Sequence, residues 1–65
     1  MTILINGKAT PFDGATLADA LNANGYADTV VATAVNGTFV PADARSDFAI
    51  KAGDQIEVLA PMQGG

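Results

Sequence analysis

Hydrophobic and polar residues alternate in two short segments at the start of the chain. Residues 2–6 read TILIN, where Ile3 and Ile5 share one face at the two-residue period of a strand. The Asn-Gly pair that follows favours the positive φ angles of a tight hairpin turn. Residues 8–12, KATPF, return as a second strand, and Pro11 suits an edge because it donates no ladder hydrogen bond. The pattern predicts an N-terminal β-hairpin.

Helical spacing follows in residues 16–25, TLADALNANG. Leu17 and Leu21 are four positions apart and share a face. Thr16 can cap the N-terminus of the helix. Asp19, three residues on, completes a pattern close to a capping box, and its negative charge suits the first turn. The final Asn-Gly pair ends the helix in a left-handed conformation. A helix of about two to three turns is unstable alone, so we expect it to pack on a sheet.

A second hairpin is predicted from VVATAVNG at residues 30–37 and TFV at residues 38–40, joined by another Asn-Gly turn. Residues 41–54 read mostly as loop, and we expect the side chains of Phe48 and Ile50 to pack into the core from this loop. The last segment, QIEVLA, alternates again and predicts a final strand. Its residues Ile56 and Val58 face inward, whereas its outward residues are Gln55, Glu57 and Leu59.

The predicted element order is β-β-α-β-β-β, an α+β domain with one mixed sheet packed on one helix. The final strand gains ladder partners on both sides if it inserts between the first and third strands. This arrangement is similar to the β-grasp fold of ubiquitin-like proteins. The elements follow from the residue pattern, whereas the strand order depends partly on the family resemblance given below.

Size and composition restrict the chemistry that the chain can perform. A 65-residue chain forms one domain and has no room for a deep internal cleft. It contains neither cysteine nor histidine. This absence excludes disulfides and metal sites built from thiolates or imidazoles. It also excludes catalysis by a Ser-His-Asp or a Cys-His arrangement. The carboxylates are scattered without calcium-loop spacing, and the glycines form no phosphate-binding motif. We expect no bound metal or cofactor and no independent enzyme activity.

The formal charge is −4, and the positive residues are Lys8, Arg45 and Lys51. Nucleic acid is an unsuitable partner because phosphate binding needs clustered lysine and arginine. Acidity favours a basic protein partner or simply maintains solubility, and both interpretations stand. The start of the chain lacks signal-peptide features, and no apolar run approaches the roughly 20 residues that span a bilayer. We therefore expect a cytoplasmic protein without membrane contact.

Two features are candidates for function. Leu59 points away from the predicted core, close to Ala32 and Ala34 if Val31, Thr33 and Val35 point inward, and it could form part of a partner-binding surface. The second feature is the ending MQGG. We expect residues 1–61 to form the domain and residues 62–65 to form an exposed tail.

A Gly-Gly tail is the thinnest and most pliable peptide available, because glycine has no Cβ. It can thread a narrow channel into another protein's active site, where the α-carboxylate of Gly65 becomes the reacting group. Joined to AMP, that inert carboxylate becomes an acyl adenylate that a sulfur donor or an amine can attack. A chain without cysteine cannot hold sulfur as a persulfide, so carried sulfur would be a C-terminal thiocarboxylate and the persulfide donor would belong to a partner.

The segments AVNGTFVP and AGDQIEVLAPMQGG, with the INGK start and the TLADAL helix, resemble the ThiS family of sulfur carriers in thiamine biosynthesis. The resemblance spans the whole chain, and PMQGG is its most specific part. It implies a ThiF-like enzyme that uses ATP to adenylate Gly65, a cysteine-desulfurase pathway that supplies sulfur, and a ThiG-like thiazole synthase that accepts it. Gly65 is then the modified residue and Gly64 its thin neighbour, while Met62 and Gln63 line partner channels.

Two alternatives stay open at this point. The small subunit of molybdopterin synthase has a similar fold and ending, although that family tends to be longer with a different run before its glycines. A ubiquitin-like module that binds partners without being activated is the other alternative. Such a module would tolerate residues added after Gly65, and a carrier would not. The loop at residues 41–54 also carries fewer positive residues than the resemblance leads us to expect.

Overall fold

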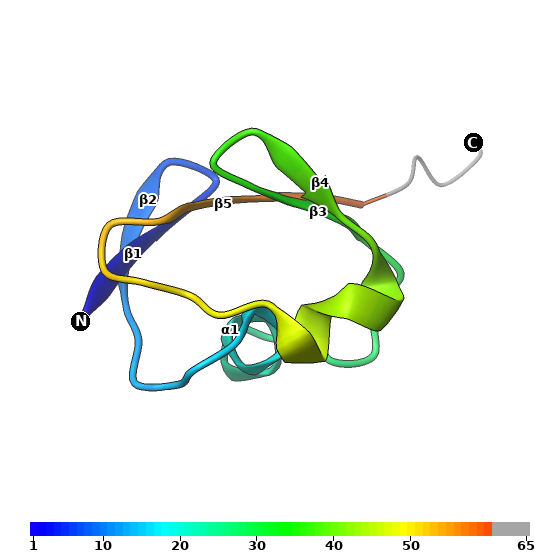
Figure 1. The fold of residues 1–65 in the computed structure, drawn as a ribbon, viewed down its shortest axis with the longest axis horizontal. Helices are drawn as coiled ribbons and strands as arrows, with labels where there is room; N and C mark the ends of the chain where they lie inside the picture. The colour runs from blue at the N-terminus through cyan, green and yellow to red at the C-terminus, as the bar shows by residue number, and fades with distance from the viewer. Residues whose placement is uncertain (61–65) are drawn as a thin grey trace.

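The computed structural model describes residues 1–60, in which five strands form one sheet above a single α-helix (Figure 1). The elements are β1 (Thr2–Ile5), β2 (Lys8–Pro11), α1 (Leu17–Ala23), β3 (Ala32–Val35), β4 (Thr38–Val40), the 3₁₀ helix η1 (Ala42–Asp47) and β5 (Gln55–Leu59). Pro61, the last residue of the predicted domain, and the predicted tail at residues 62–65 lie outside the described residues.

The sheet has the strand order β2-β1-β5-β3-β4. Strand β5 runs parallel to β1, with Ile5 opposite Ile56, and antiparallel to β3, with Ala32 opposite Leu59. The last strand therefore joins two hairpins that do not otherwise touch in the sheet, as predicted. The ubiquitin-like β-grasp fold is confirmed.

Both hairpins turn at the predicted Asn-Gly pairs. Asn6 and Asn36 each have a φ of 51°, and the glycines that follow them, Gly7 and Gly37, have φ values of 81° and 83°. Two successive residues at positive φ define a turn whose twist matches that of the flanking strands. Asparagine and glycine adopt this conformation at the lowest cost, which explains why the same dipeptide begins both turns.

Helix α1 begins with the predicted capping box. Thr16 Oγ1 accepts a hydrogen bond from the Asp19 backbone N–H at 3.2 Å, and Asp19 Oδ2 accepts from the Thr16 N–H at 3.1 Å and from the Ala15 N–H at 3.0 Å. The helix buries Leu17, Ala20 and Leu21 beneath the sheet, so its apolar face is the predicted one.

The core contains twelve buried apolar residues from every part of the described chain: Ile3, Ile5, Phe12, Leu17, Ala20, Leu21, Val31, Val35, Val40, Ile50, Ile56 and Val58. Ile50 is buried and Phe48 packs against the core from the loop, as predicted. Residues 42–47, predicted as loop, form η1 instead. Strand β3 also begins two residues later than predicted, at Ala32, because its pairing with β5 begins there, opposite Leu59, the last residue of β5.

Arg45 explains why η1 is fixed in place. Its Nη2 donates to the Val31 carbonyl oxygen at 2.6 Å, and its Nε donates to Thr33 Oγ1 at 3.1 Å. The Thr33 hydroxyl, 2% exposed, donates in turn to the Val40 carbonyl oxygen at 2.8 Å. The guanidinium therefore ties η1 to β3 and supplies a donor to a buried hydroxyl that would otherwise lack one.

We predict that the protein loses stability in acid through two carboxylates. Backbone N–H groups of Ala15 and Thr16 hold the pKa of Asp19 below its ordinary value, and the Lys51 N–H and the Asn36 amide do the same to the pKa of Asp54. Depressed folded-state pKa values stabilise the fold above the unfolded value of about 3.9, and this contribution disappears as pH falls through the folded values.

Urea-unfolding midpoints measured between pH 2 and pH 7 check this prediction. We expect a plateau above about pH 5 and a decline below about pH 4, with a shallower decline in Asp19→Asn and Asp54→Asn variants. A midpoint that rises on acidification, or variants with the unaltered slope, would contradict it.

Candidate functional site

The candidate site lies around the C-terminal end of β5, because the predicted tail at residues 62–65 comes shortly after this strand in the sequence. On one side, β5 pairs with β3 up to Leu59. On the other side β1 has already ended at Ile5, so no strand residue faces the backbone of Val58. The Asn6 side chain takes that place: its Oδ1 accepts from the Val58 N–H at 2.8 Å, and its Nδ2 donates to the Val58 carbonyl oxygen at 3.1 Å.

The Asn6 amide thus mimics a peptide group and continues the ladder one step beyond β1. The same residue supplies the positive φ of the hairpin turn and a backbone N–H that donates to the Ile56 carbonyl oxygen at 2.9 Å. One residue therefore sets the turn and secures the end of β5.

We predict that Asn6→Gly weakens the end of β5 without disturbing the turn, because glycine also adopts positive φ. The variant loses the Asn6 amide, so the Val58 N–H and carbonyl oxygen both lose their side-chain hydrogen bonds. This loss should lower the free energy of unfolding by about 1–3 kcal/mol. The matched control is Asn36→Gly, whose amide oxygen accepts from the Gln55 N–H instead. Hydrogen exchange should accelerate at the Val58 amide in the first variant and at the Gln55 amide in the second. Unchanged exchange at Val58 in Asn6→Gly would count against this role.

The sheet face turned away from α1 carries a group of exposed and half-buried residues beside the end of β5. Leu59 is 67% exposed and Phe39 is 64% exposed. Ala32 lies opposite Leu59 in the β3–β5 register, and Ala34 lies opposite both Glu57 of β5 and Phe39 of β4. We call this set, Ala32, Ala34, Phe39, Glu57 and Leu59, the outer patch.

The outer patch surrounds a shallow hollow of about 80 Å³, to which Thr33 also contributes. A second hollow continues past Leu59 and Ala60 to Val30. The one charged side chain among the outer-patch residues is that of Glu57. The surface next to the point where the described chain ends is therefore apolar with a single negative charge.

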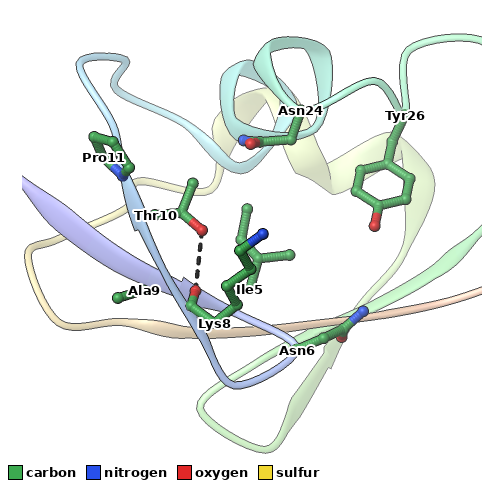
Figure 2. A pocket seen from close by; sticks show the side chains of 8 residues that line it. All are labelled: Ile5, Asn6, Lys8, Ala9, Thr10, Pro11, Asn24 and Tyr26. Atoms are coloured by element: carbon green, nitrogen blue, oxygen red, sulfur yellow. Dashed lines mark hydrogen bonds between the residues drawn. The ribbon is translucent and has the colours of Figure 1, made fainter.

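Another groove, of about 360 Å³, opens at the edge strand β2, at the opposite edge of the sheet from β4, and residues of the first hairpin line it together with Asn24 and Tyr26 (Figure 2). Lys8, Asn24 and Tyr26 bring polar atoms to its rim, and Thr10 Oγ1 donates to the Lys8 carbonyl oxygen at 3.0 Å. Its lining contains neither a carboxylate nor a nucleophile with an adjacent base. The groove therefore lacks the paired groups that acid–base or nucleophilic catalysis requires.

Of the predicted site residues, Leu59 is exposed on the outer face with Ala32 beside it, and Val31, Thr33 and Val35 point inward, as expected. The role of Leu59 in partner binding stays a prediction. The tail residues Met62, Gln63, Gly64 and Gly65 lie outside the described residues. Sequence reasoning missed Phe39, because a three-residue strand does not show which face each residue takes until its register with β3 is known.

Within residues 1–60, no group of three or more histidine, cysteine, aspartate or glutamate side chains is arranged to hold a metal ion. The same residues include no helix with the length and apolarity needed to cross a membrane.

Comparison with known proteins gives a consistent result. The sequence model of the ThiS family matches residues 3–65. A crystal structure of the thiamine biosynthesis protein ThiS from Geobacter metallireducens is similar with a TM-score of 0.82 and 32% identity, and the match covers 100% of both chains. A solution NMR structure of a thiamine biosynthesis protein from the same organism gives 0.78 and 32%, covering 100% of this chain and 88% of the other. No curated protein matched the chain.

Proposed function

Because the chain belongs to the ThiS family, we propose that it is a sulfur carrier protein of thiamine biosynthesis and catalyses no reaction of its own. A ThiF-like enzyme adenylates the Gly65 carboxylate with ATP, a cysteine-desulfurase pathway supplies sulfur, and a ThiG-like thiazole synthase receives it. The observation that carries the proposal is the family match, which extends through Gly64 and Gly65. It favours this pathway over the molybdopterin alternative.

The chemistry explains why the carrier needs an activating partner. A carboxylate resists nucleophiles because its leaving group is poor. Attack of a Gly65 carboxylate oxygen on the α-phosphorus of ATP expels pyrophosphate and gives an acyl adenylate. A partner's persulfide then attacks the carbonyl carbon, and AMP leaves with that oxygen. A thiol cleaves the acyl disulfide so formed, which leaves the thiocarboxylate on Gly65 and a new disulfide that includes the attacking thiol. The chain contains no cysteine, so the persulfide that donates sulfur belongs to a partner, and the absence of disulfides fits a reducing cytoplasm.

The described residues support this division of roles. They form a small folded domain whose groove at β2 has no catalytic pair in its lining, and the last strand, β5, ends at Leu59, shortly before the proposed tail in the sequence. Met62 and Gln63 then line the channels of the partners, and Gly64 leaves room around the reacting carbonyl because it has no Cβ. The surface at Leu59 serves partner recognition.

Intact-mass spectrometry of protein isolated from its native cell tests the proposal. We expect a fraction of molecules in which one oxygen of Gly65 is replaced by sulfur, and this fraction should vanish in cells without the ThiF-like enzyme. Cells that lack the carrier should require thiamine for growth. A carrier that never acquires sulfur, in cells that make thiamine normally without it, would refute the assignment.

A further inference from the structure

The Asn-Gly dipeptide occurs three times in the chain, beginning at Asn6, Asn24 and Asn36. We propose that Asn24 is a site of spontaneous covalent modification in the folded protein, where its side-chain amide converts to a carboxylate, and that the fold protects the other two asparagines. This inference does not depend on the proposed function. It follows from the reaction open to an asparagine that precedes a glycine, and from the different attachments of the three residues.

The reaction needs no reagent other than water. The main-chain nitrogen of the glycine attacks the side-chain carbonyl carbon of the asparagine and forms a new C–N bond. The amide nitrogen then leaves as ammonia, which carries away the proton of the glycine N–H. Water opens the resulting cyclic imide at either carbonyl, and the product is aspartate or isoaspartate. Glycine favours this attack because it has no Cβ to obstruct the nitrogen.

The attack also has a conformational requirement. The glycine nitrogen must approach the side-chain carbonyl carbon, so the main chain must rotate about the Cα–C bond of the asparagine while the amide turns. In a folded protein this rotation takes place during local opening, and the cost of opening depends on the contacts that must break. We therefore expect the asparagine with the weakest attachment to react first.

Asn6 and Asn36 are both attached to the central strand β5. The Asn6 amide bonds to both polar groups of the Val58 main chain, and its own N–H also donates to β5. At the other end of β5, the Asn36 N–H donates to the Gln55 carbonyl oxygen at 2.8 Å, and Asn36 Oδ1 accepts from the Gln55 N–H at 3.0 Å. Asn36 Nδ2 donates to Asp54 Oδ1 at 3.0 Å. Rotation at either residue would detach a hairpin turn from the centre of the sheet.

Asn24 is attached only to the last turn of α1. Its Nδ2 donates to the Ala20 carbonyl oxygen at 2.8 Å, and its N–H donates to the Leu21 carbonyl oxygen at 3.3 Å, which the Tyr26 N–H also contacts at 2.9 Å. Its side chain lies at the rim of the groove, across from Asn6 (Figure 2). A helix of seven residues has marginal stability of its own, so its last turn opens more readily than the β5 ladder.

Modification of Asn24 should loosen the end of α1. A carboxylate cannot donate to the Ala20 carbonyl oxygen, and its negative charge is unfavourable beside the C-terminal carbonyl groups of a helix. The last turn of α1 contains no basic residue to compensate for this charge. Isoaspartate would also add a methylene group to the main chain shortly before Tyr26, which packs against the core. The groove, whose lining has Lys8 as its one charged residue, would gain a negative group at its rim.

Ageing of the full chain at neutral pH for several weeks tests the inference. Asp-N protease cleaves before aspartate and places the three asparagines in separate peptides: residues 1–12, 19–27 and 28–42. Mass spectrometry detects the replacement of an amide by a carboxyl group, and fragmentation distinguishes Asn24 from Asn22 in the middle peptide. We expect Asn24 to convert at least about ten times faster than Asn6 or Asn36, because one or two hydrogen bonds of typical net strength correspond to about that factor.

The same chain unfolded in urea is the matched control. Without the fold, the three asparagines should convert at rates within about threefold of one another. A second control is Asn24→Gln, which should abolish conversion at position 24, because glutamine has to close a larger ring, and leave Asn6 and Asn36 unaffected. Conversion of Asn24 in buffer no faster than that of Asn6 and Asn36 would overturn the inference. The same tenfold preference in urea would also overturn it, since the fold would then have no part in it.

The effect on α1 is measured on the modified chain itself. Anion exchange separates this chain by its additional negative charge, and its urea-unfolding midpoint should be lower than that of the unaltered chain. The Asn24→Asp variant should reproduce the decrease that the aspartate product causes. Equal midpoints for the modified and unaltered chains would show that the modification does not loosen the helix.

Discussion

Deleting Gly65 should abolish adenylation of the chain by its ThiF-like enzyme, because the reacting carboxylate would then lie one residue, about 3.3–3.6 Å, short of the ATP. The core residues of the described chain lie between Ile3 and Val58, so we expect the urea-unfolding curve to match that of the full chain. Pyrophosphate exchange dependent on the carrier measures activation.

A matched variant with one alanine added after Gly65 strengthens this experiment. It retains every native residue but moves the free carboxylate and places a Cβ at the new terminus, so a carrier should again be inactive. A module that only binds partners, without being activated, would keep its function after either change. Adenylation of the shortened chain at the rate of the full chain would show that Gly65 is not the reacting residue.

Ile56→Ala is the substitution with the largest expected effect on stability. Ile56 is 1% exposed and lies in the central strand between Ile5 of β1 and Val35 of β3. Truncating it removes contacts on both sides and should reduce the free energy of unfolding by about 2–5 kcal/mol. A domain of this size has little stability to lose, so the variant should be partly unfolded at 37 °C.

Leu59→Ala is the control for this substitution, because it lies in the same strand with its side chain 67% exposed on the opposite face. It should change the free energy of unfolding by less than about 0.5 kcal/mol. Urea melts followed by circular dichroism compare the two variants. Equal midpoints would mean that the inward and outward faces of β5 are wrongly assigned.

The sequence predicted the local elements of the fold because each had a short-range signal. The Asn-Gly pairs marked both turns, the capping box marked the start of α1, and alternation in β5 separated Ile56 and Val58 from Leu59. The insertion of β5 between β1 and β3 has no local signal, since it pairs β5 with β1, about 50 positions away in the sequence, and its prediction depended partly on the family resemblance.

Features that sequence reasoning missed depend on contacts between distant residues. The 3₁₀ helix η1 has no periodic pattern of its own, and Arg45 fixes it through bonds to Val31 and Thr33. The role of Asn6 in extending the ladder requires knowing that β1 stops one step before Val58. In the candidate site, Leu59 could be predicted from alternation alone, whereas Phe39 required the register between β3 and β4.

The position of β5 has a consequence for how the protein is made. A nascent polypeptide can form both hairpins as it leaves the ribosome, but they share no ladder until the last strand emerges. Closure of the sheet is therefore delayed until β5 has been translated, because it requires pairing between distant segments. An incomplete polypeptide that stops before β5 would lack its central strand and be exposed to proteolysis. Quality control would thus remove copies that stop before β5.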